Sequence, residues 1–589
     1  MAAKLIDLVR AILARRRLRD LGVFVLLAVA VWVVRYWHSA DFGLYEDDFT
    51  FVPRGAAMGS GELLTFVGNY IAHLYGHGRP LTDSLIFIFS HIAWRLGGLS
   101  RAYWIGYVMV TANCLLFYAL LRRLQGNTLA LIGGLTFAFF PADTTQAFLN
   151  HSLGLHPSLM FLLLAIHLFL SGRRVLSYVV VSLVLFTYET PFLVFLAAPL
   201  LREPWVKGLR KRLLVHALVL GVMLLSVYLV RSAVGERRAA DLGFPEVLST
   251  PIVHMIEGPI VTMGLFVLRP IQALAAIDKG IALLIVLTFA TLALVLSRVR
   301  QGDTPELYGM LASLRQVGVG PLASSIRRRV FPFPVPEGTE RLVKLAIVGC
   351  LMLILAYPLT FTVRAYAIRG RDTRVHFAAV VGASILFACL WFLLLQIADA
   401  YRRRRLAALM LAGWLALLAG FGWVVQKDYV LAWTYQKEFW SHLVDLIPDV
   451  TDGTAVLVNP SGLIDTWQIA ANYWNMPRVL DQIYEFPAEW RRPPRVFRLT
   501  PDWGEFLIGE DGLFQLNAST TVAPPSTYGT IESANVIMIE TQDGALCRRQ
   551  GPIVIGDVEI PIRESQILGE PPYPHGFLYK LMIEEPRGE

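Results

Sequence analysis

Long apolar segments separated by short polar or basic connections make up most of the chain. A helix needs about 20 apolar residues to cross a bilayer, although shorter segments can be accommodated. The pattern therefore predicts a polytopic α-helical membrane protein with about 11 membrane-spanning helices. The apolar segments run from Leu21 to Trp37 and then at roughly 102–121, 128–141, 156–170, 175–187, 191–201, 213–230, 280–297, 343–361, 376–398 and 406–425.

Two further apolar segments carry polar residues that a membrane span would bury at a cost. Segment 82–97 contains Asp83 and His91, and segment 252–277 contains His254 and Glu257. This mixture is typical of amphipathic helices that lie on a membrane surface. We therefore expect two juxtamembrane helices here, neither of which crosses the membrane.

The distribution of basic residues predicts the orientation. If neither surface helix crosses, the basic clusters at 15–19, 122–123, 173–174, 207–212, 298–300, 327–329 and 402–405 all fall on one side. The positive-inside rule assigns that side to the cytoplasm. We expect a protein of the cell inner (cytoplasmic) membrane, with a cytoplasmic basic N-terminus (1–20) and a transmembrane domain (21–425) whose first external loop covers 38–101.

The hydrophobic density falls at Gln426, and residues 426–589 have the composition of a globular domain. Apolar runs of β type at 454–458, 536–539 and 553–562 alternate with turns rich in Pro and Gly. The segment is long enough to hold a core of its own. We therefore expect an extracytoplasmic α/β domain after the membrane region.

Composition agrees with a membrane protein and excludes other classes. With 55% hydrophobic and 17% charged residues and a mean hydropathy of +0.53, the chain could not be a soluble globule. A formal net charge of +8 is also found in proteins that bind nucleic acids. The basic residues lie in short loops, however, as membrane topology requires, so we expect no nucleic-acid partner. The four cysteines have neither disulfide nor zinc-ligand spacing.

Polar residues that are costly near a membrane collect on the predicted outer side, where they are candidates for function. His73 and His77, at i and i+4, could bind zinc, but no third ligand follows and we expect no metal site there. The remaining outer set comprises Glu46, Asp47 and Asp48 in the first loop, Arg79 later in that loop, Asp143, Asn150, His151 and Glu189 in the next loops, and Arg364, Arg369, Arg371, Arg374 and His376 in the loop after the ninth span.

The arginines of this last loop depart from the positive-inside rule, which disfavours basic residues outside. Such an exception indicates an anionic partner. The planar guanidinium group forms bidentate, charge-assisted hydrogen bonds with phosphate, and a lipid phosphate or pyrophosphate would lie at the outer headgroup level. The alternative is nonspecific headgroup contact, or salt bridges to the outer carboxylates and Asp372.

The acidic cluster in the first loop favours a general base. Two neighbouring carboxylates beside lipid could divide the work of taking a proton and orienting the group that takes it. We slightly favour Asp48 over Asp47 as the base. One alternative is a Mg or Mn site formed by Asp47, Asp48 and Asp143. Another is a solvated turn or a helix N-cap.

These residues are similar to motifs of the GT-C superfamily of integral-membrane glycosyltransferases, over roughly residues 20–425. Tyr45-Glu46-Asp47-Asp48 resembles the acidic motif of the family's first external loop, which supplies the catalytic base. The stretch 61–96, with Gly78-Arg79-Pro80-Leu81 at its centre, resembles the juxtamembrane helices of that loop. Asp143 resembles the second acidic position. The family's external arginines, which hold the lipid phosphate, are matched by Arg371 and Arg374, with Arg369 and Arg364 as alternates.

The resemblance implies an inverting transfer of a sugar from a polyprenyl-phosphate-linked donor to a hydroxyl of a glycan, lipid or protein acceptor on the extracytoplasmic face. Asp48 or Asp47 would take the acceptor proton, and Arg371 and Arg374 would stabilise the departing phosphate. The other substrate-binding candidates are Glu46, Arg79, Asp143, Glu189, Arg369 and His376. Arginines can take the place of a metal, so metal independence is favoured over a divalent cation (Mg or Mn).

Two other kinds of protein would also fit many apolar segments. A lipid-linked-sugar transporter or flippase should place ionisable groups at mid-membrane and show repeated halves, and the sequence has neither feature. A membrane scaffold of a cell-envelope polysaccharide pathway would instead work through residues 427–589 and would not need Asp47 or Asp48.

Overall fold

A computed structural model describes residues 20–298 and 337–584, apart from 75–77, 203–204, 206–207, 235–243, 362–363, 461, 472–475, 499–505, 509–513, 517–529, 532, 543, 556–557 and 565–566. The basic clusters at 15–19 and 327–329, and His77, lie outside the described residues.

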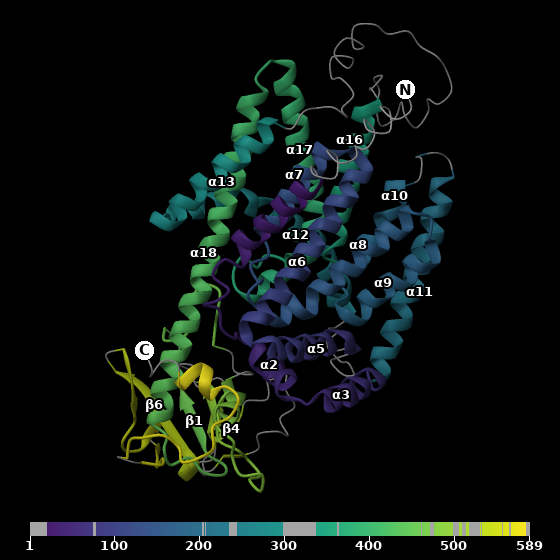
Figure 1. The fold of residues 1–589 in the computed structure, drawn as a ribbon. Coiled ribbons are helices and arrows are strands. Elements are labelled where there is room, and N and C mark those ends of the chain that lie inside the picture. The colour runs from purple at the N-terminus through teal and green to yellow at the C-terminus, as the bar shows by residue number, and fades with distance from the viewer. Residues whose placement is uncertain are drawn as a thin grey trace, which may run out of the picture.

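Helices make up the membrane part of the chain, and most of them run along one common direction (Figure 1). Residues 20–35 are helical. They are followed by α2 (Asp48–Ala57), α3 (Ser60–Ala72), α5 (Pro80–Leu96), α6 (Leu99–Gln125), α7 (Asn127–Ala138), the π-helix η1 (Asn150–Leu155), α8 (His156–Leu170), α9 (Arg174–Thr187), η2 (Phe192–Ala197), α10 (Ala198–Arg202), α11 (Leu209–Ala233), α12 (Phe244–Ala275), α13 (Lys279–Arg298), α16 (Glu337–Leu355), the 3₁₀ helix η3 (Arg371–Ala379), α17 (Val380–Ala400) and α18 (Arg404–Asp445).

Seven helices among the described residues are long and apolar enough to cross a membrane, judged by length and composition. Shorter apolar helices cover Asn127–Ala138, Arg174–Thr187 and Phe192–Arg202. The chain is therefore a multi-pass membrane protein, as expected. The predicted number of about 11 spans stays a prediction, because it depends on whether the short helices also cross. The seven are Leu99–Gln125, Asn150–Leu170, Leu209–Ala233, Ser249–Ala275, Lys279–Arg298, Arg371–Ala400 and Arg404–Asp445.

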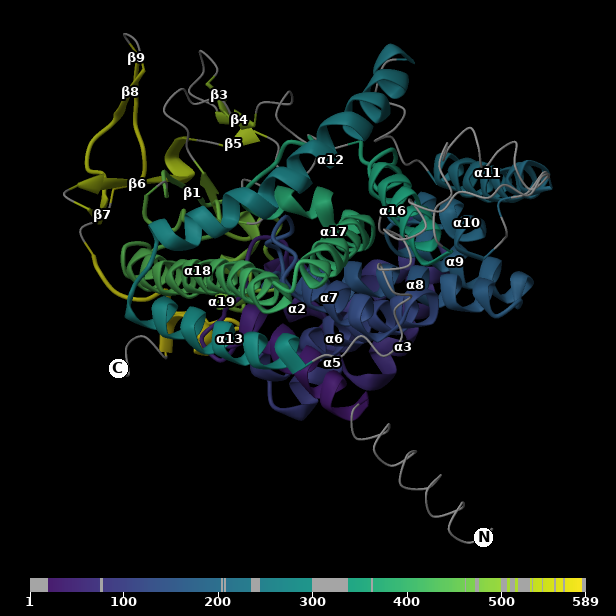
Figure 2. The ribbon, with the colours of Figure 1, turned by 90° about the horizontal axis from the view of Figure 1, so that it is seen from above.

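Helix α12 covers the segment 252–277 that the sequence assigns to a membrane surface, yet its length and composition would also allow a span. Its side chains contact the loop between α16 and α17 at widely separated points. His254 Nδ1 lies 2.8 Å from the carbonyl oxygen of Thr360, and Arg269 donates to the carbonyl oxygen of Ile368. The helix therefore lies across the ends of α16 and α17, and Figure 2 shows it extended across the view from above. The predicted surface position of α12 stays a prediction, because its length and composition equally allow a span.

The first loop folds into three helices at one end of the bundle, which we call the site end (Figure 1). Helix α2 packs on α5, and α3 also packs on α5. Gly55 allows the close approach, because a Cβ there would lie 2.7 Å from the Cα of Phe87. Pro80 begins α5 at a position where its missing N–H costs nothing. Helix α5 matches the predicted juxtamembrane segment 82–97.

The C-terminal region contains small sheets, as the β-type runs predict. The largest has the order β2-β1-β6-β7, formed by β1 (Ala455–Val458), β2 (Arg495–Arg498), β6 (Val536–Gln542) and β7 (Ala545–Arg548). Strand β1 is parallel to β2 and β6, and β7 is antiparallel to β6. Two further sheets are β3-β4-β5 (Phe506–Ile508, Phe514–Leu516, Thr530–Ile531) and the hairpin β8-β9 (Ile553–Ile555, Val558–Ile560).

The C-terminal sheets lie at the site end, next to the helices of the first loop (Figure 1). Helix α18 runs from the membrane part into this region without a break and ends at Asp445, well beyond Gln426, where the hydrophobic density falls. Two contacts join the region to the first loop. Gln482 Nε2 donates to the carbonyl oxygen of Phe49 at 2.7 Å, and the rings of Trp94 and Phe577 lie 5.0 Å apart.

Candidate functional site

Asp48 has a fully buried side chain that accepts hydrogen bonds from three backbone N–H groups. The donors are Tyr45 at 3.3 Å, Leu149 at 3.0 Å and Asn150 at 2.8 Å. Burial raises the pKa of Asp48 to about 8, although the three N–H donors act in the opposite direction. The carboxyl group therefore joins the first loop to the start of η1, about 100 residues later in the chain.

Asp47 stands in a different environment, although it is the next residue. It occupies the N-cap position of α2, but its side chain makes no capping hydrogen bond. The side chain is 20% exposed and pairs with Arg371, whose Nη2 lies 2.5 Å from Oδ2 of Asp47. Arg371 Nη1 lies 3.4 Å from Oε2 of the buried Glu46. Asp47 is thus the carboxylate of this cluster that solvent or a substrate can reach.

The backbone of Glu46 has a φ of +48°, in the left-handed region that residues other than glycine seldom adopt. Such a conformation costs roughly 1–2 kcal/mol and is often found at functional sites. Here it turns the chain so that Glu46 and Asp47 both face Arg371 while Asp48 points into the protein.

Buried polar atoms without a hydrogen-bond partner surround this cluster in the described part of the chain. They are Oδ1 of Asn150, Nδ1 of His151 and Nε of Arg374, and Oγ1 of Thr190, the residue after Glu189, is also unpartnered. Asn150 also holds Nδ2 3.5 Å from Oδ2 of Asp47. The guanidinium charge of Arg374 interacts electrostatically with His151, Arg371 and Asp47. Unpartnered buried donors and acceptors are costly, so their concentration here indicates a place prepared for a polar ligand.

A second ion cluster joins the first loop to the hairpin after α9. Arg79 donates to both carboxylate oxygens of Glu189, and Arg231 Nη2 lies 3.3 Å from Oε2 of the same residue. Burial alone would raise the pKa of Glu189, but the charges of Arg79 and Arg231 more than offset it, and the net shift is downward. The Arg79 guanidinium also lies 5.1 Å from the ring centroid of Tyr188. Two arginines facing one carboxylate leave this cluster with a net positive charge.

Asp143 is buried and is held within its own loop. Its Oδ1 accepts from the backbone N–H and the hydroxyl of Thr145, at 2.9 and 2.7 Å. Burial raises the pKa of Asp143, and the nearby charge of Arg35 opposes the shift. The carboxyl group therefore stabilises the loop between α7 and η1.

The residue after Asp143 connects three segments at the site end. The hydroxyl of Thr144 lies 3.0 Å from that of Thr373 and donates to Oε1 of Gln468 at 2.8 Å. The same Oε1 accepts from the N–H of Gly370 at 3.1 Å. Gln468 belongs to the C-terminal region, so that region helps to position the arginine loop that begins at Gly370.

Three other residues from the predicted site lie apart from the Asp47 cluster. The buried His376 has Nδ1 2.9 Å from the hydroxyls of Thr262 and Tyr357, and Nε2 2.8 Å from the carbonyl oxygen of Ala367. It therefore anchors α12 to the arginine loop. Arg369 is exposed, and Arg364 is exposed and donates to the hydroxyl of Tyr366 at 2.7 Å.

The contacts of the three carboxylates do not favour the Mg or Mn site that was the alternative to a general base. Asp48 is held by backbone N–H groups, Asp143 by Thr145 and Asp47 by Arg371. No group of three His, Cys, Asp or Glu residues suited to a metal ion is found among the residues that the structure describes. The chemistry of this cluster is therefore derived from its side chains alone.

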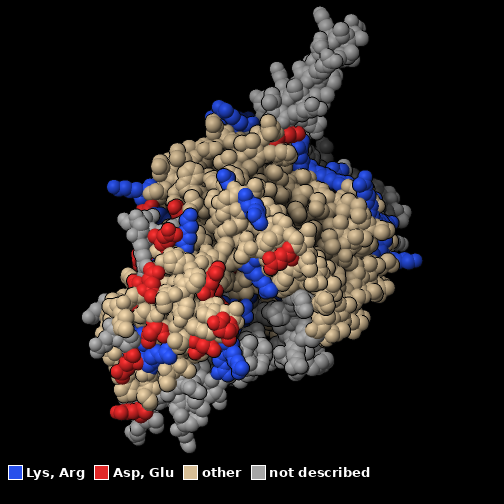
Figure 3. Space-filling model, turned by 60° about the horizontal axis from the view of Figure 1, so that its bottom comes forward, with Lys and Arg blue, Asp and Glu red and all other residues tan. Residues whose placement is uncertain are grey.

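Figure 3 brings the site end forward and shows basic and acidic side chains close together in the middle of this face, within a largely uncharged surface. The sequence analysis named most residues of the two ion clusters, but it did not name Arg231, which ends the apolar helix α11. Only the return of α9 and α11 to the same end brings Arg231 beside Glu189 and Arg79.

Comparisons with known proteins leave the family open. No protein-family model matches the chain, and no curated protein matches it. Among solved structures, the chain is similar to ArnT from Cupriavidus metallidurans, both bound to undecaprenyl phosphate and in the apo state. Each alignment has 15% identity and covers 81% of this chain and 85% of ArnT, with TM-scores of 0.33 and 0.32. Scores at this level carry no conclusion about the fold or activity of this chain.

Proposed function

We propose that the chain is a membrane glycosyltransferase of GT-C type. It would transfer a sugar from a polyprenyl-phosphate-linked donor to an acceptor hydroxyl at the membrane surface that carries the site end. The observation that carries the proposal is the pairing of a partly exposed carboxylate, Asp47, with Arg371, beside Arg374. The reaction needs one base and a cationic site for phosphate within the reach of one substrate.

Arg371 and Arg374 would bind the phosphate of the donor. Both precede α17, whose apolar side chains would adjoin the polyprenyl chain. Arg374 keeps Nε without a partner in the described part of the chain, and Arg371 can exchange Asp47 for a phosphate oxygen. The guanidinium groups would then stabilise the charge that grows on the phosphate as the sugar departs.

Asp47 would be the general base, rather than Asp48. A base must be ionised at the working pH and must reach the acceptor hydroxyl. Asp48 is fully buried and both of its oxygens accept backbone N–H bonds, so the acceptor hydroxyl cannot reach it. Asp47 is partly exposed and pairs with an arginine. Asp48 would act as a positioning residue, since its bonds to Leu149 and Asn150 fix the turn that presents Asp47.

The proposed step is a single displacement. Asp47 takes the proton from the acceptor hydroxyl while the oxygen forms a bond to the anomeric carbon of the sugar. The bond from that carbon to the phosphate oxygen breaks, and its electron pair remains on the phosphate, which Arg371 and Arg374 hold. Attack opposite the leaving group inverts the anomeric centre. The unpartnered polar atoms of Asn150, His151 and Thr190 would contact hydroxyls of the sugar.

Paired variants test the roles of the two aspartates. The full chain, reconstituted in lipid nanodiscs, is given radiolabelled polyprenyl-phosphate sugars and a cell-envelope acceptor extract. Asp47→Asn should lower transfer by about 10²–10⁴-fold while the melting temperature is kept, because a general base contributes about that factor. Asp48→Asn should lower the melting temperature, because an amide cannot accept all three N–H bonds.

Asp41→Asn is the matched control, because Asp41 lies in the same loop with a side chain that is 62% exposed. It should transfer sugar at the parental rate. Parental transfer by Asp47→Asn would overturn the assignment of the base. A scaffold or transporter would instead show no transfer in the parent protein, although it would bind the labelled donor.

A further inference from the structure

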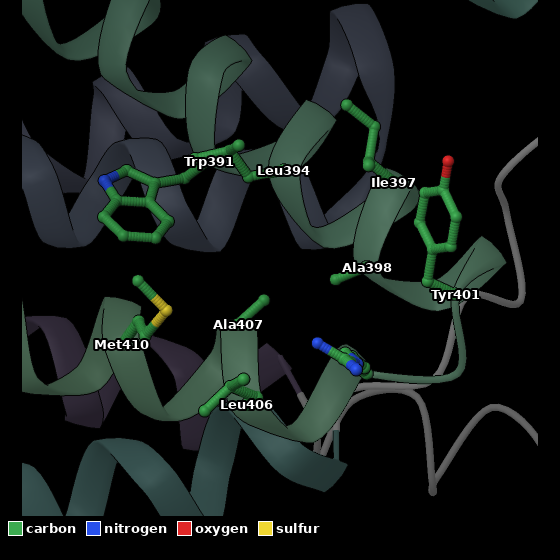
Figure 4. Close-up of a pocket in the computed structure, with 9 residues that line it drawn as sticks. Trp391, Leu394, Ile397, Ala398, Tyr401, Leu406, Ala407 and Met410 are labelled. Carbon is green, nitrogen blue, oxygen red and sulfur yellow. The ribbon is translucent and has the colours of Figure 1, made fainter.

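A groove lies between α17 and α18 where the two helices are joined, at the end of the bundle opposite Asp47 (Figures 1 and 4). Its volume is about 590 Å³. This falls within the range of roughly 300–1,000 Å³ that is typical of pockets for small ligands. None of its lining residues belongs to the proposed transfer site.

Small side chains leave the space between the two helices unfilled at this place. Ala398 on α17 and Ala407 on α18 face the gap close to the helical connection, and Trp391 and Met410 face it further along (Figure 4). The walls are apolar, and the side chain of Met410 is 59% exposed. Because these helices are in a membrane protein, the ligand that meets such walls is an acyl chain.

Arginines close the groove at the helical connection. Arg403 lines it, and the connection carries four consecutive arginines, Arg402 to Arg405, against the single nearby acid Asp399. Arg402 adopts a φ of +58°, so the chain turns sharply immediately before Arg403, which lines the groove. An apolar cleft that ends in exposed arginines is complementary to a lipid with an anionic phosphate head.

We propose that this groove binds an anionic phospholipid, with an acyl chain between α17 and α18 and the phosphate at Arg403. The lipid would not be the sugar donor, because its phosphate lies at the far end of α17 from Arg371. It would stabilise the hairpin whose other ends carry the arginine loop and the C-terminal region. The inference does not depend on the proposed transfer reaction.

Lipid binding to the full chain tests this proposal without any assay of activity. The protein in detergent is given phosphatidylglycerol or phosphatidylcholine with the same acyl chains. Bound lipids are counted by native mass spectrometry, and the melting temperature is measured. Phosphatidylglycerol should bind at least threefold more than phosphatidylcholine and should raise the melting temperature further. Equal binding and equal stabilisation by both lipids would overturn the proposal, and this comparison needs no variant.

Two variants then locate the site. Arg403→Gln should abolish the preference for phosphatidylglycerol, and Ala398→Trp, which fills the groove, should lower the binding of both lipids. Arg173→Gln is the matched control for charge, because Arg173 is exposed in another connection at the same end, between α8 and α9. It should keep the parental preference. A preference that survives Arg403→Gln, or unchanged binding by Ala398→Trp, would place the lipid elsewhere and overturn the proposal.

Discussion

Two adjacent aspartates at the start of α2 differ in burial, because Asp48 is fully buried and Asp47 is partly exposed. This difference separates their proposed roles. Sequence patterns identified the acidic cluster and an arginine loop, and the structure brings Asp47 and Arg371 together across more than 300 residues. Sequence patterns could not distinguish the roles of Asp47 and Asp48, because N–H donors that hold Asp48 come from Leu149 and Asn150, about 100 residues later. Our slight preference for Asp48 as the base stays untested, and the geometry leads us to propose Asp47 instead.

The buried Glu189 should make the stability of the protein sensitive to acid. Its folded-state pKa lies below the ordinary value of 4.5, so ionised Glu189 stabilises the protein above that pH. The stabilisation is lost as the pH falls through the folded-state pKa. The melting temperature of the parent should therefore decrease when the pH is lowered past about 4.5. The Glu189→Gln variant should have a lower melting temperature than the parent at neutral pH, and its melting temperature should decrease less in acid.

Glu62→Gln serves as the control, since Glu62 caps α3 at an exposed position and should keep the parental pH profile. If Glu189→Gln shows the same acid dependence as the parent, the pairing with Arg79 and Arg231 does not contribute to stability.

At the scale of helices, hydrophobic periodicity predicted most of the elements, and tertiary contacts decided the rest. Runs of about 20 apolar residues became α6, α11 and α13 with similar bounds. The end of α18 could not be predicted, because packing against the C-terminal region keeps residues beyond Gln426 helical after the apolar pattern stops. The π-helix η1 also lacks a sequence signal, and Asp48 accepts a hydrogen bond from the N–H of its first residue, Asn150.

The contact between α16 and α17 depends on glycine. A Cβ at Gly382 would overlap the backbone nitrogen of Leu353 and lie 2.6 Å from the carbonyl oxygen of Gly349. Gly382→Ala should therefore separate the helices and lower stability by about 1–3 kcal/mol. Gly221→Ala is the control, because nothing lies within 4 Å of a Cβ at that position of α11. Equal melting temperatures for the two variants would contradict this packing.

At the scale of the whole molecule, the site is assembled from both parts of the chain. Gln468 and Gln482 of the C-terminal region contact Gly370 and Phe49, next to the arginine loop and the acidic cluster. The division into a membrane part and a small β-containing region could be predicted from composition. The position of that region over the site could not, because it depends on single hydrogen bonds between segments more than 90 residues apart.

Labelling of Cys547 tests the predicted orientation. This free cysteine in β7 is half-buried, and we expect it on the extracytoplasmic side. A membrane-impermeant maleimide should label it in intact spheroplasts, and Cys547→Ser should remove that label. Labelling that appears only after the membrane is broken would reverse the orientation and move the proposed site to the cytoplasmic face.

The most direct test of the central claim is a cryo-electron microscopy map of the full chain with a bound polyprenyl phosphate. The account predicts the phosphate within about 3 Å of Arg371 and Arg374, with Arg371 turned from Asp47 toward the ligand and the Asp47 carboxylate facing the sugar side. A phosphate bound elsewhere, with the Asp47–Arg371 pair unchanged, would contradict it.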